Sequence, residues 1–411
     1  MTYAKTFIWL LCALSISMAS AAKKTPPAPK TKTEVAKPTS APIQEIHIAY
    51  LSQVQTPPAA LSNLDVFIPN KGEPGAQLAI TDNNTTGQFT QQNFILHSFS
   101  VSEQENIGEF FNKNIAGKYN LILLNLPSDK LLALADLKPI QPALFFNVAN
   151  TDDALRNEQC RANMLHLLPS RAMKADALAQ YLLKKRWQKW FLVTGPSDND
   201  ARYAAALKRS AKRFGLKIST EKVWEHTFDN RRSEQADVPV FTQVDDYDVL
   251  VVADEQGLFG EYLAYRTWLP RPIVGTQGLI ATAWHKTHDA WGATQIQNRF
   301  KDKNGRWMEE EDYGAYLAVR AIGEAASRSR SNQLESINNY LISDQLALQG
   351  YKGSPLSFRP WDGQLRQPVL LAADRSMVGV APIEGFLHPK TELDTLGFDQ
   401  PETKCNFNAP N

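Results

Sequence analysis

The feature that most constrains the fold is an alternation of short apolar runs with segments of helical periodicity, which starts at Ile46. Uninterrupted apolar runs are typical of strands buried on both faces of a parallel sheet. The sequence therefore predicts an α/β fold with a parallel-sheet core. The first expected strands are Ile46–Leu51, Phe94–Val101, Leu121–Leu126 and Ala143–Val148, and the expected helices are Gly75–Asn83, Glu103–Ile115 and Asp129–Leu137.

The same rhythm starts again near Ser170 and indicates a second α/β unit. An amphipathic helix is expected after Ser170, and Gly215 can end the next helix as a C-cap. The expected strands are Trp190–Thr194, Val249–Ala253 and a short one from Ile273. Beyond them we expect the helices Thr287–Phe300, Tyr313–Ala326 and Leu334–Leu348 and the strands Pro355–Phe358, Val369–Ala373 and Met377–Ala381.

The first 22 residues have the layout of a secretory signal peptide. Lys5 precedes the apolar run Phe7–Met18, and small residues follow up to Ala22, where we expect cleavage. An uncleaved anchor is the alternative, although the run is shorter than the roughly 20 residues of a spanning helix. Residues 23–42 are rich in Pro, Lys and Thr and predict an extended tether. The signal-peptide layout predicts that the rest of the protein works outside the cytoplasm.

The charge balance excludes an electrostatic affinity for nucleic acid, because 44 Lys and Arg face 43 Asp and Glu. Cys12 leaves with the signal peptide, so Cys160 and Cys405 remain. In an oxidising compartment an even pair favours one disulfide, and two separate thiols are the alternative. The pair offers too few ligands for a metal site.

Enzyme signatures are scarce in this chain. It contains no G-x-S-x-G, no H-E-x-x-H, no P-loop and no C-x-x-C. His285 and His288 have a metal-like spacing, but a solvated pair is the simpler interpretation. The acidic group at 245–248 reads more simply as a turn before a strand, and the basic run at 184–189 as a solvated helix end. We expect a binding protein without a cofactor and not an enzyme.

Several stretches resemble the type I periplasmic binding proteins, which include the leucine/isoleucine/valine-binding proteins of ABC importers. Gly75–Asn83 resembles the first helix of that family, with its Asp-x-Asn end, and Asn147–Leu155 resembles its S-P-A-A-T-N-P-E-L segment. Leu192–Gly215 resembles the strand, loop and helix that open the second lobe, and Lys352–Pro368 resembles the final β-hairpin region.

A narrower resemblance is to the substrate-binding proteins associated with PQQ-dependent alcohol dehydrogenase systems. It is carried by SRAMKADALAQYLLKKRWQKWFLVTGP, YDVLVVADEQGLFGEYLAYRTW, FRPWDGQLRQPVLLA and GFLHPKTELDTLGFDQPETKC. The resemblance covers nearly all of the chain beyond the tether.

The family resemblance implies two Rossmann-like lobes, each discontinuous in sequence, joined by a three-strand hinge. Lobe 1 would contain residues 43–164 and 284–348, and lobe 2 would contain 165–283 and 349–405. Residues 406–411 would form a C-terminal tail. The ligand would lie between the lobes, which close on it by hinge motion.

The resemblance also assigns ligand-binding positions. Those on the first lobe are Ser128, Ala149 and Thr151, whose hydroxyls and backbone N–H groups suit an anion. Those on the second lobe are Tyr203, Asp254 and Gln277. From local pattern alone, Ser128, Thr151 and Asp254 can instead be helix N-caps and Tyr203 a core residue.

The last position departs from the family. Amino-acid binders have a carboxylate for the ligand ammonium where this chain has Gln277, and a neutral amide cannot form that ion pair. Asp254 or Glu255 can take the role instead. The resemblance therefore implies a small polar metabolite linked to PQQ-dependent alcohol oxidation and argues against a branched-chain amino acid.

The predicted function is that of a periplasmic solute-binding protein of an ABC importer. Its expected partners are a small-molecule ligand and an ABC transporter permease, with no nucleic acid and no membrane insertion after signal cleavage, and we expect a monomer. A sensor or adaptor that uses the same fold to contact a membrane partner is the alternative. A periplasmic hydrolase is a third hypothesis.

Overall fold

The computed structural model describes residues 42–54, 56, 67–137, 141–224 and 234–407, without the side chains of 234–236. The predicted signal peptide and all but the last residue of the predicted tether lie outside the described residues. In the described part of the chain, no helix is at once long enough and apolar enough to span a membrane.

The first strands of the chain form a five-stranded sheet with the order β2-β1-β3-β4-β5. Every neighbouring pair is parallel, which confirms the predicted parallel core. The strands are β1 (Gln44–Gln53), β2 (Gln92–Val101), β3 (Leu121–Asn125), β4 (Leu144–Asn147) and β5 (Met164–His166). Strand β5 was not predicted, because three residues are too few to give a pattern.

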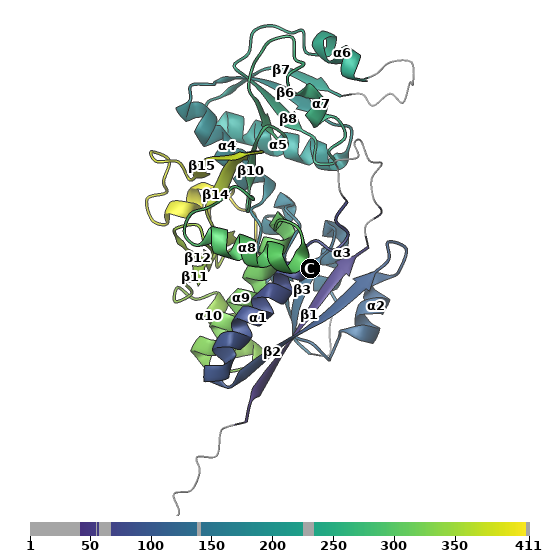
Figure 1. Ribbon diagram of the computed structural model, residues 1–411, viewed down its shortest axis with the longest axis vertical. Coiled ribbons are helices and arrows are strands. Elements are labelled where there is room, and N and C mark those ends of the chain that lie inside the picture. Colours follow the sequence, from purple (N-terminus) through teal and green to yellow (C-terminus); the bar gives the residue numbers. More distant parts are fainter. Residues whose placement is uncertain (1–41, 55, 57–66, 138–140, 225–233, 408–411) are drawn as a thin grey trace, which may run out of the picture. The chain divides into compact units, whose positions relative to one another are not determined.

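Both faces of this sheet are buried, as continuous apolar strands require (Figure 1). Leu121 and Leu123 pack in one core with the helices that follow Lys71 and Trp284, and Ile122 and Leu124 pack in another core on the opposite face. The first face carries α1 (Glu73–Thr90), α8 (Ala293–Asn304), α9 (Glu310–Ser329) and α10 (Leu334–Leu341), and the second carries α2 (Ile107–Asn114), α3 (Ser128–Ala135) and the 3-10 helix η1 (Asp153–Arg156).

A seven-stranded sheet has the order β15-β14-β10-β9-β8-β6-β7. Its strands β10, β9, β8, β6 and β7 are parallel, and β14 and β15 are antiparallel additions at one edge. The bounds are β6 (Lys189–Thr194), β7 (Lys217–Val223), β8 (Val249–Ala253), β9 (Ile273–Gly275), β10 (Leu279–Thr282), β14 (Val369–Ala373) and β15 (Ser376–Ala381).

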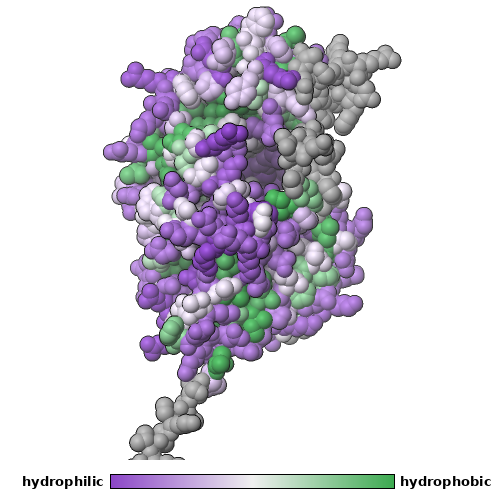
Figure 2. Space-filling model, in the orientation of Figure 1, coloured by the Kyte–Doolittle hydropathy of each residue, from purple (hydrophilic) through white to green (hydrophobic). Residues whose placement is uncertain are grey.

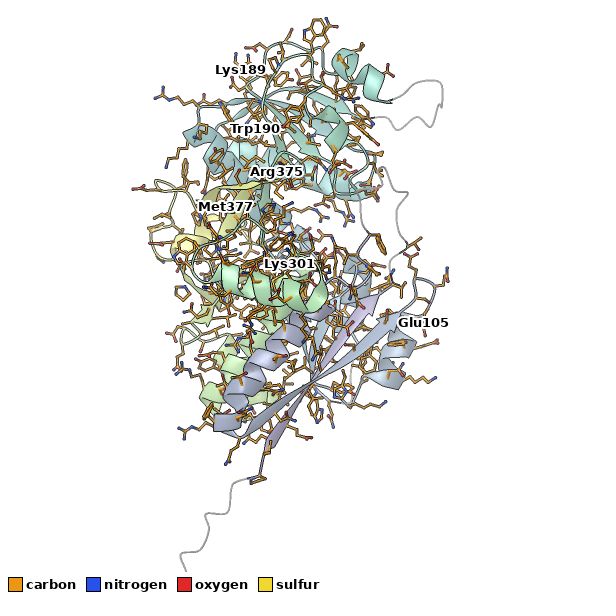
Figure 3. The ribbon with its side chains drawn as sticks, viewed as in Figure 1. Glu105, Lys189, Trp190, Lys301, Arg375 and Met377 are labelled. Atoms are coloured by element: carbon orange, nitrogen blue, oxygen red, sulfur yellow. A yellow bond between two sulfur atoms is a disulfide. The ribbon has the colours of Figure 1, made fainter. Side chains whose placement is uncertain are left out.

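Helices cover this sheet on both faces as well. Leu192 and Val251 pack against α4 (Arg171–Lys184) and α5 (Asp198–Arg213). Val193 and Val252 pack on the opposite face, beside α6 (Glu234–Phe241) and α7 (Gly260–Leu263). Trp190 at the start of β6 is fully buried, whereas its neighbour Lys189 is exposed (Figure 3). The basic run at 184–189 is therefore a solvated helix end and strand start.

Three connections join the two sheets: from β5 to α4, from β10 to α8, and from β13 to β14. The last follows a small antiparallel sheet of β11 (Leu348–Gln349), β12 (Pro355–Phe358) and β13 (Leu365–Arg366), and a 3-10 helix η2 (Glu392–Thr395) lies near the C-terminus. This is the predicted α/β fold with two parallel-sheet lobes. The lobe boundaries given above stay predictions.

Four predicted helices are wrong in their extent: the first runs on to Thr90, the second begins only at Ile107, and two later ones are shorter than expected. The segment Thr287–Phe300 becomes helical only at Ala293, because Trp291 and Gly292 have φ values of 50° and 86°, which no right-handed helix accommodates. The segment Leu334–Leu348 stays helical only to Leu341, and Leu348 pairs with Leu356 of β12 instead. In the latter segment, strand pairing overrides the local apolar pattern.

Candidate ligand-binding site

A cavity of about 530 Å³ lies where strand ends of both sheets meet. Ala149 and Thr151 follow β4, the stretch Asp254–Gly257 follows β8, and Gln277 follows β9. The carboxyl ends of parallel strands are the usual place for ligands in α/β folds. Figure 2 shows a hollow in the molecular face, with hydrophilic residues along part of its rim.

Five of the six predicted ligand-binding residues line this cavity: Ala149, Thr151, Tyr203, Asp254 and Gln277. Ser128 instead lines a neighbouring cavity of about 430 Å³, which shares Ala149 and Thr151 with the first. The structure thus gathers most of these positions at one place, and their binding roles stay predictions.

The hydroxyl of Ser128 is occupied within the chain. It donates to Oδ2 of Asp152 at 3.0 Å and lies beside the Asn150 amide. Ser128 does not cap α3, since the N-cap position belongs to Pro127. The hydroxyl serves to fix the loop after β4.

That loop is shaped by Asn147. Its Oδ1 accepts from the N–H groups of Ala149 at 3.4 Å and Asn150 at 2.9 Å, and its Nδ2 donates to the Asn150 carbonyl at 2.8 Å. Asp152, and not Thr151, is the N-cap of η1, since its side chain accepts from the N–H of Ala154. The Thr151 hydroxyl makes no hydrogen bond to any described residue and can meet a ligand.

The Asp254 side chain forms hydrogen bonds with the backbone of the loop that follows it. Its carboxylate accepts from the N–H groups of Leu258 at 2.9 Å, Phe259 at 2.9 Å and Gly260 at 2.7 Å, and the residue is 1% exposed. Asp254 is not the N-cap of α7, since that position belongs to Phe259, but its carboxylate binds the N–H groups of the loop that leads into the helix. Asp254 holds the cavity wall in place, and its oxygens are not free to pair with a ligand ammonium.

The Gln277 side chain is also hydrogen-bonded to neighbouring residues. Its Oε1 accepts from the Thr276 hydroxyl, and its Nε2 donates weakly to the Asp254 carbonyl at 3.4 Å. A Cβ at Gly260 would lie 2.0 Å from that Oε1, so a larger residue there would force the Gln277 side chain to move. The side chain that replaces the expected carboxylate is neutral and already engaged.

The charged groups of the cavity come mostly from residues that sequence reasoning missed. Glu309, Glu310 and Glu311 open α9, and Lys174 lies in the first turn of α4. In a sequence, acidic residues at the start of a helix are usually explained by their favourable interaction with the helix dipole. The sequence around such a residue does not show whether it only stabilises the helix or also lines a cavity.

Glu310 is the most firmly held of these groups. It accepts from Lys174 Nζ at 2.6 Å, from the Thr282 hydroxyl at 2.6 Å and from the N–H of Ala283. Burial acts to raise its pKa, but the Lys174 ammonium and these hydrogen bonds outweigh burial and lower the pKa below its ordinary value. Glu310 therefore remains a carboxylate.

Glu255 and Glu311 are held in different ways. Glu255 accepts two bonds from the Arg171 guanidinium, at 2.8 and 2.6 Å. Among the described cations, Lys71 Nζ lies 3.9 Å from Glu311, and burial raises the pKa of Glu311. The two carboxylates therefore differ in how well their charge is compensated.

Tyr203 stands on α5 beside these carboxylates. It is 3% exposed, and its hydroxyl makes no hydrogen bond to any described residue. Burial raises the pKa of Tyr203, and the negative charges of Glu255 and Glu310 raise it further. The hydroxyl is therefore protonated and without a partner at the wall of the cavity.

The histidine pair and the acidic group that have metal-like spacing in the sequence do not form a metal site among the described residues. The described residues contain no group of three or more His, Cys, Asp or Glu side chains arranged to hold a metal ion. His285 contacts the Thr287 hydroxyl, whereas His288 is 3% exposed and contacts the Tyr351 carbonyl, so the predicted solvated pair is wrong for His288. Asp248 accepts from the backbone N–H of Lys189, which is the expected turn role.

A disulfide joins Cys160 and Cys405 across 245 positions of sequence. It fastens the segment after η2 to the loop between η1 and β5. Next to it, Asn157 Oδ1 accepts from the N–H of Lys404, and the Thr403 hydroxyl donates to the Arg156 carbonyl at 3.2 Å.

Solved structures with the same fold are found among bacterial transport proteins. A branched-chain amino acid ABC transporter periplasmic ligand-binding protein from Burkholderia xenovorans is 15% identical, with a TM-score of 0.65 over 89% of this chain and 100% of its own. A leucine-, isoleucine-, valine-, threonine- and alanine-binding protein from Brucella ovis, in a closed conformation, is 12% identical, with a TM-score of 0.65 over 84% of this chain and 93% of its own.

A solute-binding protein of an ABC transporter from R. palustris, in complex with benzoate, is 10% identical, with a TM-score of 0.59 over 88% of this chain and 99% of its own. At such identities the likeness shows the fold. No curated protein sequence matches the chain. The family model for periplasmic binding proteins matches residues 115–373, which is more than half of the chain. The chain therefore belongs to the periplasmic binding protein family, which consists of binding proteins and not of enzymes.

Proposed function

We propose that this protein is the solute-binding component of an ABC importer and captures a small polar metabolite in the periplasm. The observation that carries the proposal is the cavity between the strand ends of the two sheets, lined by residues of both. Its volume of about 530 Å³ suits a small molecule. Similar structures include proteins named for leucine and a complex with benzoate, which supports a small organic ligand.

Ligand binding would close the two lobes about the three connections between the sheets. Closure excludes water and so strengthens the polar contacts of the ligand. The ABC transporter permease as partner and the periplasmic location are part of the same proposal, and the apolar N-terminal segment supports the location. The resemblance of four segments to proteins of PQQ-dependent alcohol dehydrogenase systems supports a solute linked to alcohol oxidation.

Thermal unfolding with a panel of alcohols, aldehydes, carboxylates, amines and amino acids tests solute binding. A ligand present at 100 times its Kd stabilises the folded protein by about 2.7 kcal/mol, which a melting curve resolves. The matched control is Gln256→Trp, since Gln256 lines the cavity from an exposed position and an indole there fills it. Stabilisation of the natural protein but not of this variant supports the proposal, and no stabilisation by any compound at millimolar concentration contradicts it.

Uptake tests the transport role. Cells that lack the protein should take up the labelled solute poorly, and the natural protein but not Gln256→Trp should restore uptake. Normal uptake in the deletion strain would contradict a role in import and would favour the sensor or adaptor alternative.

A further inference from the structure

The cavity holds more negative than positive charge. Asp254, Glu255, Glu309, Glu310 and Glu311 line it, against the two ammonium groups of Lys71 and Lys174 among the described residues. Burial and the charge of Lys286 lower the pKa of His285, the other basic residue of the lining, so its imidazole is neutral at pH 7. The excess of carboxylates disfavours an anionic ligand.

Ion pairs within the protein compensate only part of this excess negative charge. Lys174 compensates Glu310 at 2.6 Å, and Arg171 compensates Glu255. Lys71 lies 3.9 Å from Glu311, beyond hydrogen-bond reach. Even when Arg171 is counted, three cations face five carboxylates, and in a partly dehydrated cavity an uncompensated negative charge attracts a cation strongly.

Tyr203 supplies an independent indication of what is bound. Its side chain is 97% buried at the wall of the cavity, and its hydroxyl has no partner among the described residues. The hydroxyl faces the cavity, where a ligand can take it as a hydrogen-bond acceptor. Glu255 and Glu310 line the same cavity as Tyr203, so a ligand group in it finds carboxylate and hydroxyl oxygens, all of which accept hydrogen bonds.

The groups that would hold a ligand carboxylate are largely engaged. The Ser128 hydroxyl donates to Asp152, and the N–H of Ala149 is directed at Asn147 Oδ1. Thr151 is the one member of the predicted anion-binding set whose side chain has no partner among the described residues. A ligand carboxylate would gain little here and would meet the excess negative charge.

On the basis of the proposed function, we propose that the ligand is an organic cation without a carboxylate, of the class of primary amines and diamines. The ammonium would donate to the Tyr203 hydroxyl and lie among the carboxylates that line the cavity. Ile280 and Trp284 also line the cavity and give the methylene groups of such a ligand an apolar surface.

Calorimetric titration with matched pairs tests the ligand class. Putrescine and ornithine share one carbon chain and differ by a carboxylate, as do cadaverine and lysine, and leucine is added as a neutral amino acid. Each diamine should bind at least about tenfold more tightly than its amino acid, a difference of about 1.4 kcal/mol. Binding of leucine, or of an amino acid more tightly than its diamine, would overturn the cation proposal while the solute-binding function stands. Binding of no compound, here and in the wider panel, would overturn both.

Tyr203→Phe tests the contact itself. It removes a hydroxyl that has no internal partner, so the midpoint of urea unfolding should stay within error while diamine affinity falls about tenfold. The matched control is Tyr181→Phe on α4, which does not line the cavity and should change neither quantity. Unchanged diamine affinity in Tyr203→Phe would overturn the assigned contact.

Discussion

Lys174 and Glu310 form an ion pair of 2.6 Å between α4, which packs on the seven-stranded sheet, and α9, which packs on the five-stranded sheet. Arg202 of α5 makes a second such link, at 2.7 Å from Asp152 in the loop after β4. Both pairs cross from one sheet with its helices to the other and border the proposed ligand cavity or its neighbour. The two ion pairs therefore contribute both to the stability of the fold and to the arrangement of residues around the cavity.

Replacement of one partner of the Lys174–Glu310 pair should be destabilising. The side chains are only 16% and 22% exposed, so Lys174→Met leaves a poorly solvated carboxylate. We expect a loss of about 2 kcal/mol in the free energy of unfolding by urea. The double variant Lys174→Met/Glu310→Gln should recover part of the loss, because no buried charge then lacks its partner. Equal stability of Lys174→Met and the natural protein would show that the pair contributes nothing.

The same pair predicts a dependence of stability on pH. Because the folded pKa of Glu310 lies below its ordinary value of 4.5, the stabilisation is complete above that value and is lost as the pH falls through the lower, folded pKa. The stability difference between the natural protein and Glu310→Gln should therefore be constant from pH 6 to 7 and shrink below about pH 4.5. Urea unfolding at several pH values measures it, and a difference that grows on acidification would contradict the assignment.

Positions at strand ends could be predicted from sequence, whereas the charged lining could not. Ala149, Thr151 and Asp254 follow apolar runs, and the carboxyl ends of parallel strands meet at one edge of a sheet. Glu310 and Lys174 lie 136 positions apart on helices of different layers, and no local periodicity reports their pairing. Ser128 matches the family pattern locally, but its hydroxyl is taken by Asp152, a partner that only the folded loop shows.

Asp254 should matter for stability more than for direct ligand contact. Asp254→Ala leaves the N–H groups of Leu258, Phe259 and Gly260 without their acceptor, and we expect a loss of about 2 kcal/mol. Asp254→Asn keeps one acceptor oxygen and should lose less. The control is Asp246→Ala, whose exposed ion pair with Arg271 should be worth less than about 1 kcal/mol. If Asp254→Ala unfolds at the same urea concentration as the control, Asp254 does not support the loop.

Gly275 at the end of β9 should not tolerate a side chain. Its φ of 118° disfavours other residues, and a Cβ there would lie 2.1 Å from the carbonyl oxygen of Val252 in the neighbouring strand. Gly275→Ala should cost at least about 2 kcal/mol, since strain and a clash with backbone combine. Gly117→Ala is the matched control, because its φ of 74° is also positive while nothing lies within 4 Å of the added Cβ. Similar melting temperatures for the two variants would refute the role of the close contact.

The Cys160–Cys405 disulfide should stabilise the protein mainly through the unfolded chain. It closes a loop across 245 positions, and loops of that length lose much of their entropy when cross-linked. Removal of the bond by dithiothreitol or by Cys160→Ser/Cys405→Ser should lower the free energy of unfolding by about 4 kcal/mol. The segment should stay docked after reduction, because Arg209 and Arg213 both donate to the Gly397 carbonyl at 2.8 Å. The natural protein should therefore lose stability on reduction and the double variant should not, and a reductant effect on both would point to a cause other than this bond.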